Sequence, residues 1–280
     1  FIKTAMKPRE HNMDINKIYN EDCFSTMEKI GSNTIDTILT SPPYNTGGRV
    51  EYWSNTIIEG KRVYTQNKRY DKFLDTQTEE EYLNWSVKLF NGYDKILKTN
   101  GVILYNLSYG NENPNTMWLL IAKLLTETDF MVADCIVWKK SSALPNTTSK
   151  NKLTRICEFV FVIVRKSEFK TFNTNKKVTT VSIKGQNFYS VFYNIIEAKN
   201  NDKSTKLNKA TFSTDFAKSL LDMYAMDNSV VYDSFMGTGT VANACIISER
   251  GLGFIGSEMS EKQCEYAEDR ILKANINIAN

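Results

Sequence analysis

The sequence has little of what metal sites, disulfide frameworks and membrane spans require. Its only histidine is His11, and its five cysteines are widely spaced, with no CxxC pair. With so few ligating side chains we expect no metal site. Scattered cysteines in an odd number are typical of reduced thiols in a cytoplasmic protein. No apolar run approaches the ~18 residues of a membrane-spanning helix, and no signal-peptide pattern opens the chain.

Charge of one sign is not in large excess either. The chain carries 35 Lys and Arg against 32 Asp and Glu, a formal net charge of +3 that does not by itself indicate a nucleic-acid partner. The distribution is uneven, because residues 165–209 contain ten basic and three acidic residues. A second basic stretch, residues 61–72, interleaves Lys and Arg with tyrosines. Such runs fit either a solvated face or a polyanionic partner.

What is present is enough apolar sequence for a real core. The 280 residues are 41% hydrophobic and 12% aromatic, which excludes disorder as the main state and suits one large domain or two small ones. Short apolar runs alternate with amphipathic segments, as in a parallel sheet covered by helices on both faces. We predict strands at 35–39, 102–106, 136–138, 159–164, 230–232 and 253–256, and helices at 79–97, 116–128, 214–226, 240–250 and 261–273.

Two segments interrupt this alternation. Residues 46–78 are polar, aromatic and glycine-containing, without periodicity, and residues 166–208 are rich in Lys, Asn and Thr, with weak β character near 178–183 and 188–195. Loops this long inside a compact domain are usually functional or disordered. We therefore expect residues 46–78 to form a mobile loop that contacts a ligand.

The first motif that carries chemistry is the hexapeptide TSPPYN at residues 40–45, directly after a predicted strand. Two adjacent prolines hold the main chain extended and remove two backbone donors. The hydroxyl of Ser41, the carbonyl of Pro42 and the ring of Tyr44 are then presented together at the carboxyl end of a strand, where open α/β sheets bind ligands. An amino group needs two acceptors and a planar base needs a stacking surface, and this hexapeptide offers both.

The second motif is DSFMGTGT at residues 233–240, between a predicted strand and a predicted helix. Its glycines allow close backbone approach, and the helix N-terminus offers free N–H groups. It is not the GxGxxG of nicotinamide binding, because the third glycine is missing. Glu258 ends the following strand, where a ribose diol would be held. Together these features indicate a nucleoside ligand.

TSPPYN followed by DSFMGTGT resembles the S-adenosylmethionine-dependent DNA amino-methyltransferases of restriction–modification type. The order, with the catalytic motif first and the cofactor loop last, resembles the β arrangement of that family, over roughly residues 18–274. The resemblance implies a doubly wound, mostly parallel, seven-stranded α/β sheet, circularly permuted, with an inserted target-recognition segment. It implies an N-terminal extension (1–17), a catalytic half (18–165), a target-recognition segment (166–208) and a cofactor-binding half (209–280).

The resemblance also assigns roles to residues. The catalytic tetrapeptide would be Ser41, Pro42, Pro43 and Tyr44. The methionine end of the cofactor would contact Asp233, Phe235, Gly237 and Gly239, with Phe212 beside it in a segment that lacks the family's usual His and Pro residues. Glu258 would accept from the ribose and Asp22 from the adenine amino group. Double-stranded DNA would be bound by basic residues of the two irregular segments, namely Lys61, Arg62, Lys68, Arg69, Lys176, Lys177 and Lys184.

Members with serine at the Ser41 position mostly methylate cytosine N4, and those with aspartate mostly adenine N6. We therefore expect a DNA cytosine-N4 methyltransferase that acts on a flipped-out base by direct in-line transfer. The first alternative is the same enzyme type acting on adenine N6. The second is a non-catalytic DNA-binding module, or a methyltransferase for another substrate. A monomer or homodimer with a cognate restriction endonuclease as partner is expected.

Overall fold

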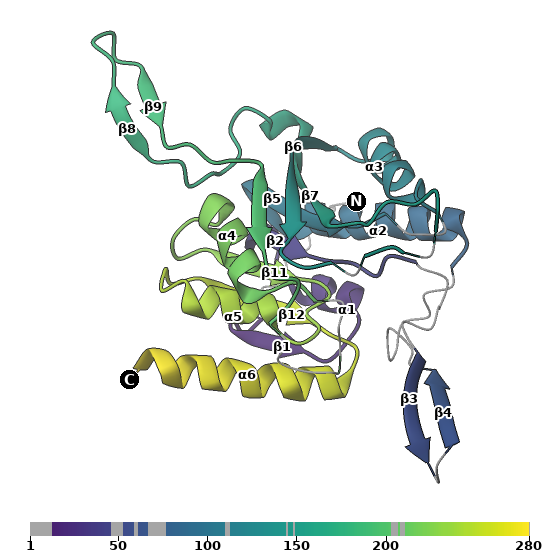
Figure 1. Ribbon diagram of the computed structural model, residues 1–280. Coiled ribbons are helices and arrows are strands. Elements are labelled where there is room, and N and C mark those ends of the chain that lie inside the picture. Colours follow the sequence, from purple (N-terminus) through teal and green to yellow (C-terminus); the bar gives the residue numbers. More distant parts are fainter. Residues whose placement is uncertain are drawn as a thin grey trace, which may run out of the picture.

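Figure 1 shows a computed structural model of the chain. It describes residues 13–45, 53–58, 61–66, 77–109, 113–143, 145–147, 149–202, 207 and 211–279, with the backbone alone for 53–58, 61–66 and 277–279. One large sheet dominates, in the strand order β1-β12-β11-β2-β5-β7-β6-β10. Its strands are β1 (Lys17–Tyr19), β12 (Gly253–Ser257), β11 (Val230–Asp233), β2 (Ile35–Thr40), β5 (Leu97–Leu107), β7 (Cys157–Arg165), β6 (Phe130–Lys140) and β10 (Ile195–Ala198).

All neighbouring strands of this sheet are parallel except at β7, which runs antiparallel to both β5 and β6. The predicted mostly parallel α/β fold is thus confirmed. The sheet has eight strands where seven were expected. The six strands listed from the sequence are all in this sheet, and the two that were not listed are β1 and β10. Strand β10 comes from the predicted target-recognition segment and pairs with β6. It joins the sheet because its alternate residues Ile196 and Ala198 pack against the core.

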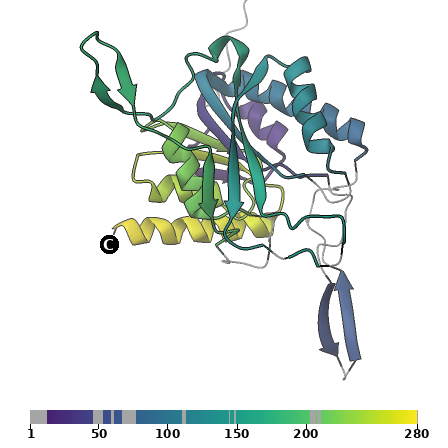
Figure 2. The same cartoon turned by 45° about the horizontal axis from the view of Figure 1, so that its top comes forward.

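In the part of the chain that the structure describes, six α-helices cover the sheet, three on each face (Figure 1 and Figure 2). One face carries α1 (Cys23–Lys29), α2 (Glu79–Ile96) and α3 (Thr116–Glu127), and their buried residues share one hydrophobic cluster. The other carries α4 (Thr214–Tyr224), α5 (Thr240–Ile247) and α6 (Glu261–Ala279), whose buried residues form a second cluster. Among the described residues, no helix is both long and apolar enough to cross a membrane.

Helix α2 illustrates why these segments are helical. Thr78 and Glu81 form a capping box, in which Glu81 N donates to Thr78 Oγ1 and Thr78 N donates to a carboxylate oxygen of Glu81. Three glutamates occupy the first turn, where the helix dipole favours negative charge. The buried positions, which include Tyr82, Leu89 and Tyr93, recur three or four residues apart and place one apolar stripe against the sheet.

Two small hairpins project from opposite sides of the molecule (Figure 1 and Figure 2). The first pairs β3 (Trp53–Ile58) with β4 (Lys61–Gln66) inside the segment predicted as a loop; the rest of 46–76 lies outside the described residues. The second pairs β8 (Val178–Val181) with β9 (Asn187–Tyr189), after the short 3-10 helix η1 (Lys166–Glu168). The predicted extension 1–17 ends early, because Lys17 belongs to β1 and Asn16 N donates to Phe254 O at 2.7 Å.

Candidate active site

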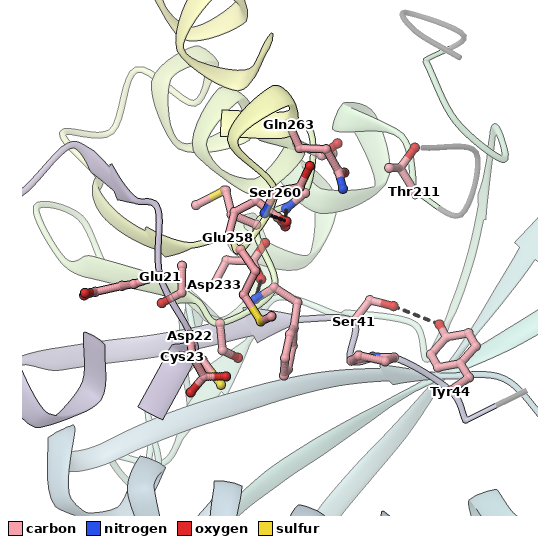
Figure 3. A pocket seen from close by; sticks show the side chains of 18 of the residues that line it. Glu21, Asp22, Cys23, Ser41, Tyr44, Thr211, Asp233, Glu258, Ser260 and Gln263 are labelled. Carbon is pink, nitrogen blue, oxygen red and sulfur yellow. Dashed lines mark hydrogen bonds between the residues drawn. The ribbon is translucent and has the colours of Figure 1, made fainter. Parts of the chain in front are cut away.

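A cavity opens at the carboxyl ends of β2, β11 and β12, with about 1000 Å³ of empty space including its open mouth (Figure 3). Its walls come from segments far apart in the chain: the turn before α1, the TSPPYN motif, α2, the residues just before α4, the glycine loop and the start of α6. Both predicted motifs therefore face one space.

Asp233 ends β11 inside this cavity and is 3% exposed. Its Oδ1 accepts from Thr40 Oγ1 at 2.7 Å and from Phe235 N at 3.0 Å. Burial raises the pKa of this carboxyl group to about 7, Glu258 adds to the rise, and the two hydrogen bonds oppose it. A carboxylate so poorly solvated gains most from a cationic ligand.

Glu258 and Asp22 line the same cavity (Figure 3). One oxygen of Glu258 accepts from Gly237 N at 2.9 Å and the other from Ser260 N at 2.8 Å, which fixes the carboxylate between the glycine loop and α6. Asp22 is the N-cap of α1, where its side chain accepts from Phe24 N at 2.9 Å. Both acids are positioned by backbone amides.

The two glycines of the loop have different roles. Gly237 lines the cavity with φ of 53°, so a side chain there would be strained, and its backbone N–H is held by Glu258. Gly239, also predicted to contact the cofactor, does not line the cavity. It is the N-cap of α5 with φ of 77°, and an added Cβ would meet Ala267 Cβ at 2.8 Å. Its structural role is the close packing of α5 on α6.

Aromatic rings form the apolar part of the wall. Phe235 lies 5.8 Å from Trp85 between ring centroids, and Phe24 lies 6.4 Å from Trp85. Phe212, as predicted, lines the cavity, and it packs edge-on against Phe216. The sequence reasoning missed Trp85, because it belongs to no motif; only its place on the buried side of the predicted helix could have suggested it.

The TSPPYN motif follows β2 with Ser41, Pro43 and Tyr44 in the cavity wall, whereas Pro42 is buried outside it. Ser41 Oγ and Tyr44 OH lie 2.9 Å apart (Figure 3). The Pro43 carbonyl already accepts from Tyr82 OH at 2.7 Å. Among the described residues no group donates to the Pro42 carbonyl. The hydroxyl of Ser41 is thus the acceptor that the motif presents in the cavity wall, and the Pro42 carbonyl is an acceptor that no described group uses.

The predicted DNA-binding residues are not brought to this cavity. Lys176, Lys177 and Lys184 belong to the β8–β9 hairpin, which projects from the amino end of β10, at the edge of the sheet opposite the cavity (Figure 1). Just before this hairpin, Asn175 Nδ2 donates to Asp222 O at 3.1 Å, near the C-terminal end of α4, and so ties the segment to that edge. The side chains of Lys61 and Arg62, and all of Lys68 and Arg69, lie outside the described residues.

A different basic segment lies beside the cavity. Residues 139–157, which connect the carboxyl end of β6 to the start of β7, carry five basic residues and no acid. Arg155 is held by its Nη1 bond to Tyr109 O at 2.6 Å and lies 4.2 Å from the Tyr109 ring centroid. The sequence reasoning missed this segment because it is shorter than the basic run it noted. Its basic residues are Lys139, Lys140, Lys150, Lys152 and Arg155.

Among the described residues, no three His, Cys, Asp or Glu side chains gather closely enough to hold a metal ion. All five cysteines are unpaired. What the cavity offers is carboxylates, backbone N–H groups and aromatic rings, a set suited to a cationic nucleoside.

Comparison with known proteins identifies the family to which the chain belongs. A family model described as DNA methylase, of the N6/N4 methyltransferase type, matches residues 35–269. The chain is 21% identical to the type II methyltransferase M.MjaI of Methanocaldococcus jannaschii, with 88% of each chain covered. It is 22% identical to M.BglII of Bacillus subtilis, over 93% of this chain and 69% of that protein.

Solved structures share the fold. PvuII DNA methyltransferase (cytosine-N4-specific) superposes with a TM-score of 0.65 at 16% identity, covering 94% of this chain and 92% of the other. The M1.HpyAVI–SAM complex gives 0.56 at 19% identity, covering 91% and 98%. Since the family model spans most of the chain, the protein belongs to the N6/N4 DNA methylase family and uses S-adenosylmethionine as its cofactor.

Proposed function

We propose that the protein transfers a methyl group from S-adenosylmethionine to the exocyclic N4 of a cytosine flipped out of duplex DNA. The observation that carries this proposal is the placement of the Ser41 hydroxyl in the same cavity as the buried Asp233 carboxyl group. Serine in the motif favours cytosine over adenine by resemblance. The cytosine-N4 specificity named for the PvuII enzyme, a structural neighbour, supports the same choice.

The cavity suits the cofactor, whose sulfonium centre supplies an electrophilic methyl group when bound. Asp233 is placed to stabilise its positive charge, because a buried carboxylate has little competing hydration. Phe235 and Trp85 provide apolar surface for a planar ring. By resemblance, Glu258 would accept from the ribose and Asp22 from the adenine amino group.

The base would bind at the TSPPYN motif. Its amino nitrogen is a poor nucleophile because the lone pair is delocalised into the ring. Hydrogen bonds from that group to Ser41 Oγ and to the Pro42 carbonyl favour a pyramidal nitrogen whose lone pair can attack. Ser41 lies at a recessed cavity wall, which a base inside the duplex does not reach; the base must therefore be extruded, and the Tyr44 ring offers it a stacking surface.

Duplex DNA would lie along the edge of the sheet that carries the cavity. The basic segment 139–155 lies on that edge, whereas the β8–β9 hairpin leaves the opposite one. Phosphate contacts from this segment would offset the cost of extruding the base. The names of the relatives, type II methyltransferases, support a cognate restriction endonuclease as a functional partner.

The test is methylation of bacterial genomic DNA with isotope-labelled S-adenosylmethionine, followed by digestion to nucleosides and mass spectrometry. Labelled N4-methyl-2′-deoxycytidine is expected, with its sequence context mapped by modification-sensitive sequencing. Ser41→Ala should slow transfer about 10²–10³-fold while cofactor binding is retained. Labelled N6-methyl-2′-deoxyadenosine alone would assign the base to adenine instead, and no label in DNA would refute the proposal.

A further inference from the structure

A charged pair lies directly behind the TSPPYN motif. Glu158, at the start of β7, is paired with Lys140, at the end of β6. The Glu158 side chain is 12% exposed and that of Lys140 is 23% exposed. A carboxylate this buried needs several donors, and it finds them in Lys140, Asn106 and Tyr44. It therefore belongs to the wall that positions Ser41.

The hydrogen-bond directions in this wall follow from Glu158. An ionised carboxylate only accepts, so Tyr44 OH, at 3.3 Å from Glu158 Oε2, donates its single hydrogen to it. For the same reason the Asn106 amide presents Nδ2 to the carboxylate, at 2.9 Å, and the same nitrogen donates to Tyr44 OH at 2.9 Å. Asn106 is 1% exposed, so water does not replace these bonds.

This leaves one possible direction for the bond between Ser41 Oγ and Tyr44 OH. Because the phenol hydrogen is directed at Glu158, the 2.9 Å contact requires Ser41 to be the donor. The hydrogen of Ser41 then points away from the ligand. Asn106 Nδ2 lies 3.5 Å from Ser41 Oγ and can donate weakly to one of its two lone pairs, and the other remains for an incoming N–H. A serine hydroxyl, which can donate or accept, thereby behaves as an acceptor.

We propose that Glu158 is a positioning residue that fixes Ser41 as a hydrogen-bond acceptor and receives, through Tyr44, the proton that leaves the methylated nitrogen. The inference rests on the proposed function and holds for either amino base. As the N–C bond forms, the C–S bond breaks and its electron pair stays on sulfur. The nitrogen then gives a proton to Ser41 Oγ, Ser41 gives its own to the Tyr44 oxygen, and Tyr44 gives its own to Glu158, which ends neutral.

The first experiment measures binding, without turnover and without cofactor. Duplexes carry, at the mapped target position, either the amino base or its keto counterpart: cytosine against uracil, or adenine against hypoxanthine. Each stands opposite an abasic site, so that pairing costs are equal. If Ser41 can only accept, the duplex with the amino base should bind about tenfold more tightly than the duplex with the keto base. In Glu158→Gln the amide donates to Tyr44, Ser41 is free to donate, and the preference should fall to about twofold or less.

The second experiment measures single-turnover methyl transfer. Glu158→Gln should lower the rate about 10–100-fold with cofactor affinity unchanged. Tyr44→Phe removes the connecting hydroxyl and keeps the ring; in this background Glu158→Gln should add less than about a twofold loss. The matched control is Glu197→Gln, because Glu197, on β10, pairs at 2.9 Å with Lys139, the β6 neighbour of Lys140, but is 59% exposed and not joined to Tyr44.

The outcomes separate the two proposals. Unchanged base preference in a Glu158→Gln protein that still binds cofactor would refute the inference. So would a full additional rate loss in the Tyr44→Phe background, because Glu158 would then act by another route. If the wild-type chain methylates no DNA, the proposed function fails, whereas a wild-type enzyme that is active and insensitive to Glu158→Gln refutes the inference alone.

Discussion

At the scale of single residues, Asp233 shows how burial and function are connected. Its carboxyl group is 3% exposed, and burial raises the pKa to about 7 from an ordinary value of 3.8. Because the folded-state pKa is above the unfolded one, this group stabilises the fold fully below pH ~3.8 and loses that contribution as the pH rises to about 7. A buried acid that is costly to ionise without ligand is placed where the cofactor brings positive charge.

Cofactor affinity should therefore depend on pH. A cationic ligand favours ionised Asp233, so binding below pH 7 must release the proton that the free protein holds. We expect affinity for S-adenosylmethionine to fall by up to about tenfold per pH unit below 7 and to level off above about 8. Calorimetry in buffers of different ionisation enthalpy measures both the affinity and the released proton. Asp233→Asn should bind weakly with little pH dependence; a flat wild-type profile would contradict the assignment.

At the scale of elements, the two basic segments lie on different edges of the sheet. Lys150 and Lys152 lie in the connection from β6 to β7 beside the cavity, whereas Lys176 and Lys177 lie at the base of the β8–β9 hairpin. That hairpin exposes apolar side chains, with Val181 56% exposed and Tyr189 52% exposed. An isolated two-stranded hairpin is marginally stable in water, so a covering partner would stabilise it.

Neutralising each lysine pair tests which edge binds DNA. Lys150→Gln with Lys152→Gln should weaken duplex binding and reduce the magnitude of the slope of log K against log salt by about 2, since each phosphate contact contributes about 0.9. The matched double variant of Lys176 and Lys177 should leave the slope unchanged. If instead the Lys176 and Lys177 variant alone reduced the slope, DNA would be bound by the hairpin segment, as the charge count along the sequence first indicated.

At the scale of the whole molecule, the active site exists only when the two ends of the fold meet. Asp22 and Ser41 come from the first part of the chain, and Asp233 and Glu258 from the last. They meet because β11 lies between β2 and β12 in the sheet. A ligand that contacts all of these segments binds only the assembled fold and shifts its unfolding equilibrium.

Thermal unfolding should show this linkage. Cofactor at about 100 times its Kd contributes about 2.7 kcal/mol, which corresponds to a Tm increase of roughly 5 °C in a chain of this length. Gly237→Val, which puts a branched side chain on a cavity-lining residue with a positive φ, should keep a cooperative transition but lose the shift. Gly185→Val is the matched control, because Gly185 also has a positive φ, of 81°, with nothing within 4 Å. A full shift in Gly237→Val would rule out this loop as the cofactor site.

Local chemistry in the sequence determined the core elements and the two motifs. Every predicted strand and helix is present, because apolar periodicity and caps such as Thr78 with Glu81 act over a few residues. The motif after β2 and the loop after β11 could be placed for a similar reason: carboxyl ends of parallel strands meet at one edge. Ser41 and Asp233 were thus predicted to share a site from sequence alone.

Tertiary structure alone decided what surrounds those motifs. Glu158 touches Tyr44 across 114 residues of sequence, and β10 joins the sheet through pairing with β6, neither of which a local pattern encodes. Gly239 was assigned to the cofactor by the family resemblance, but whether it faces a cofactor or Ala267 depends on how α5 packs against α6. Local rules specify which residues can do chemistry, whereas long-range packing specifies which of them meet, because strand order and helix contacts are set by burial of the whole core.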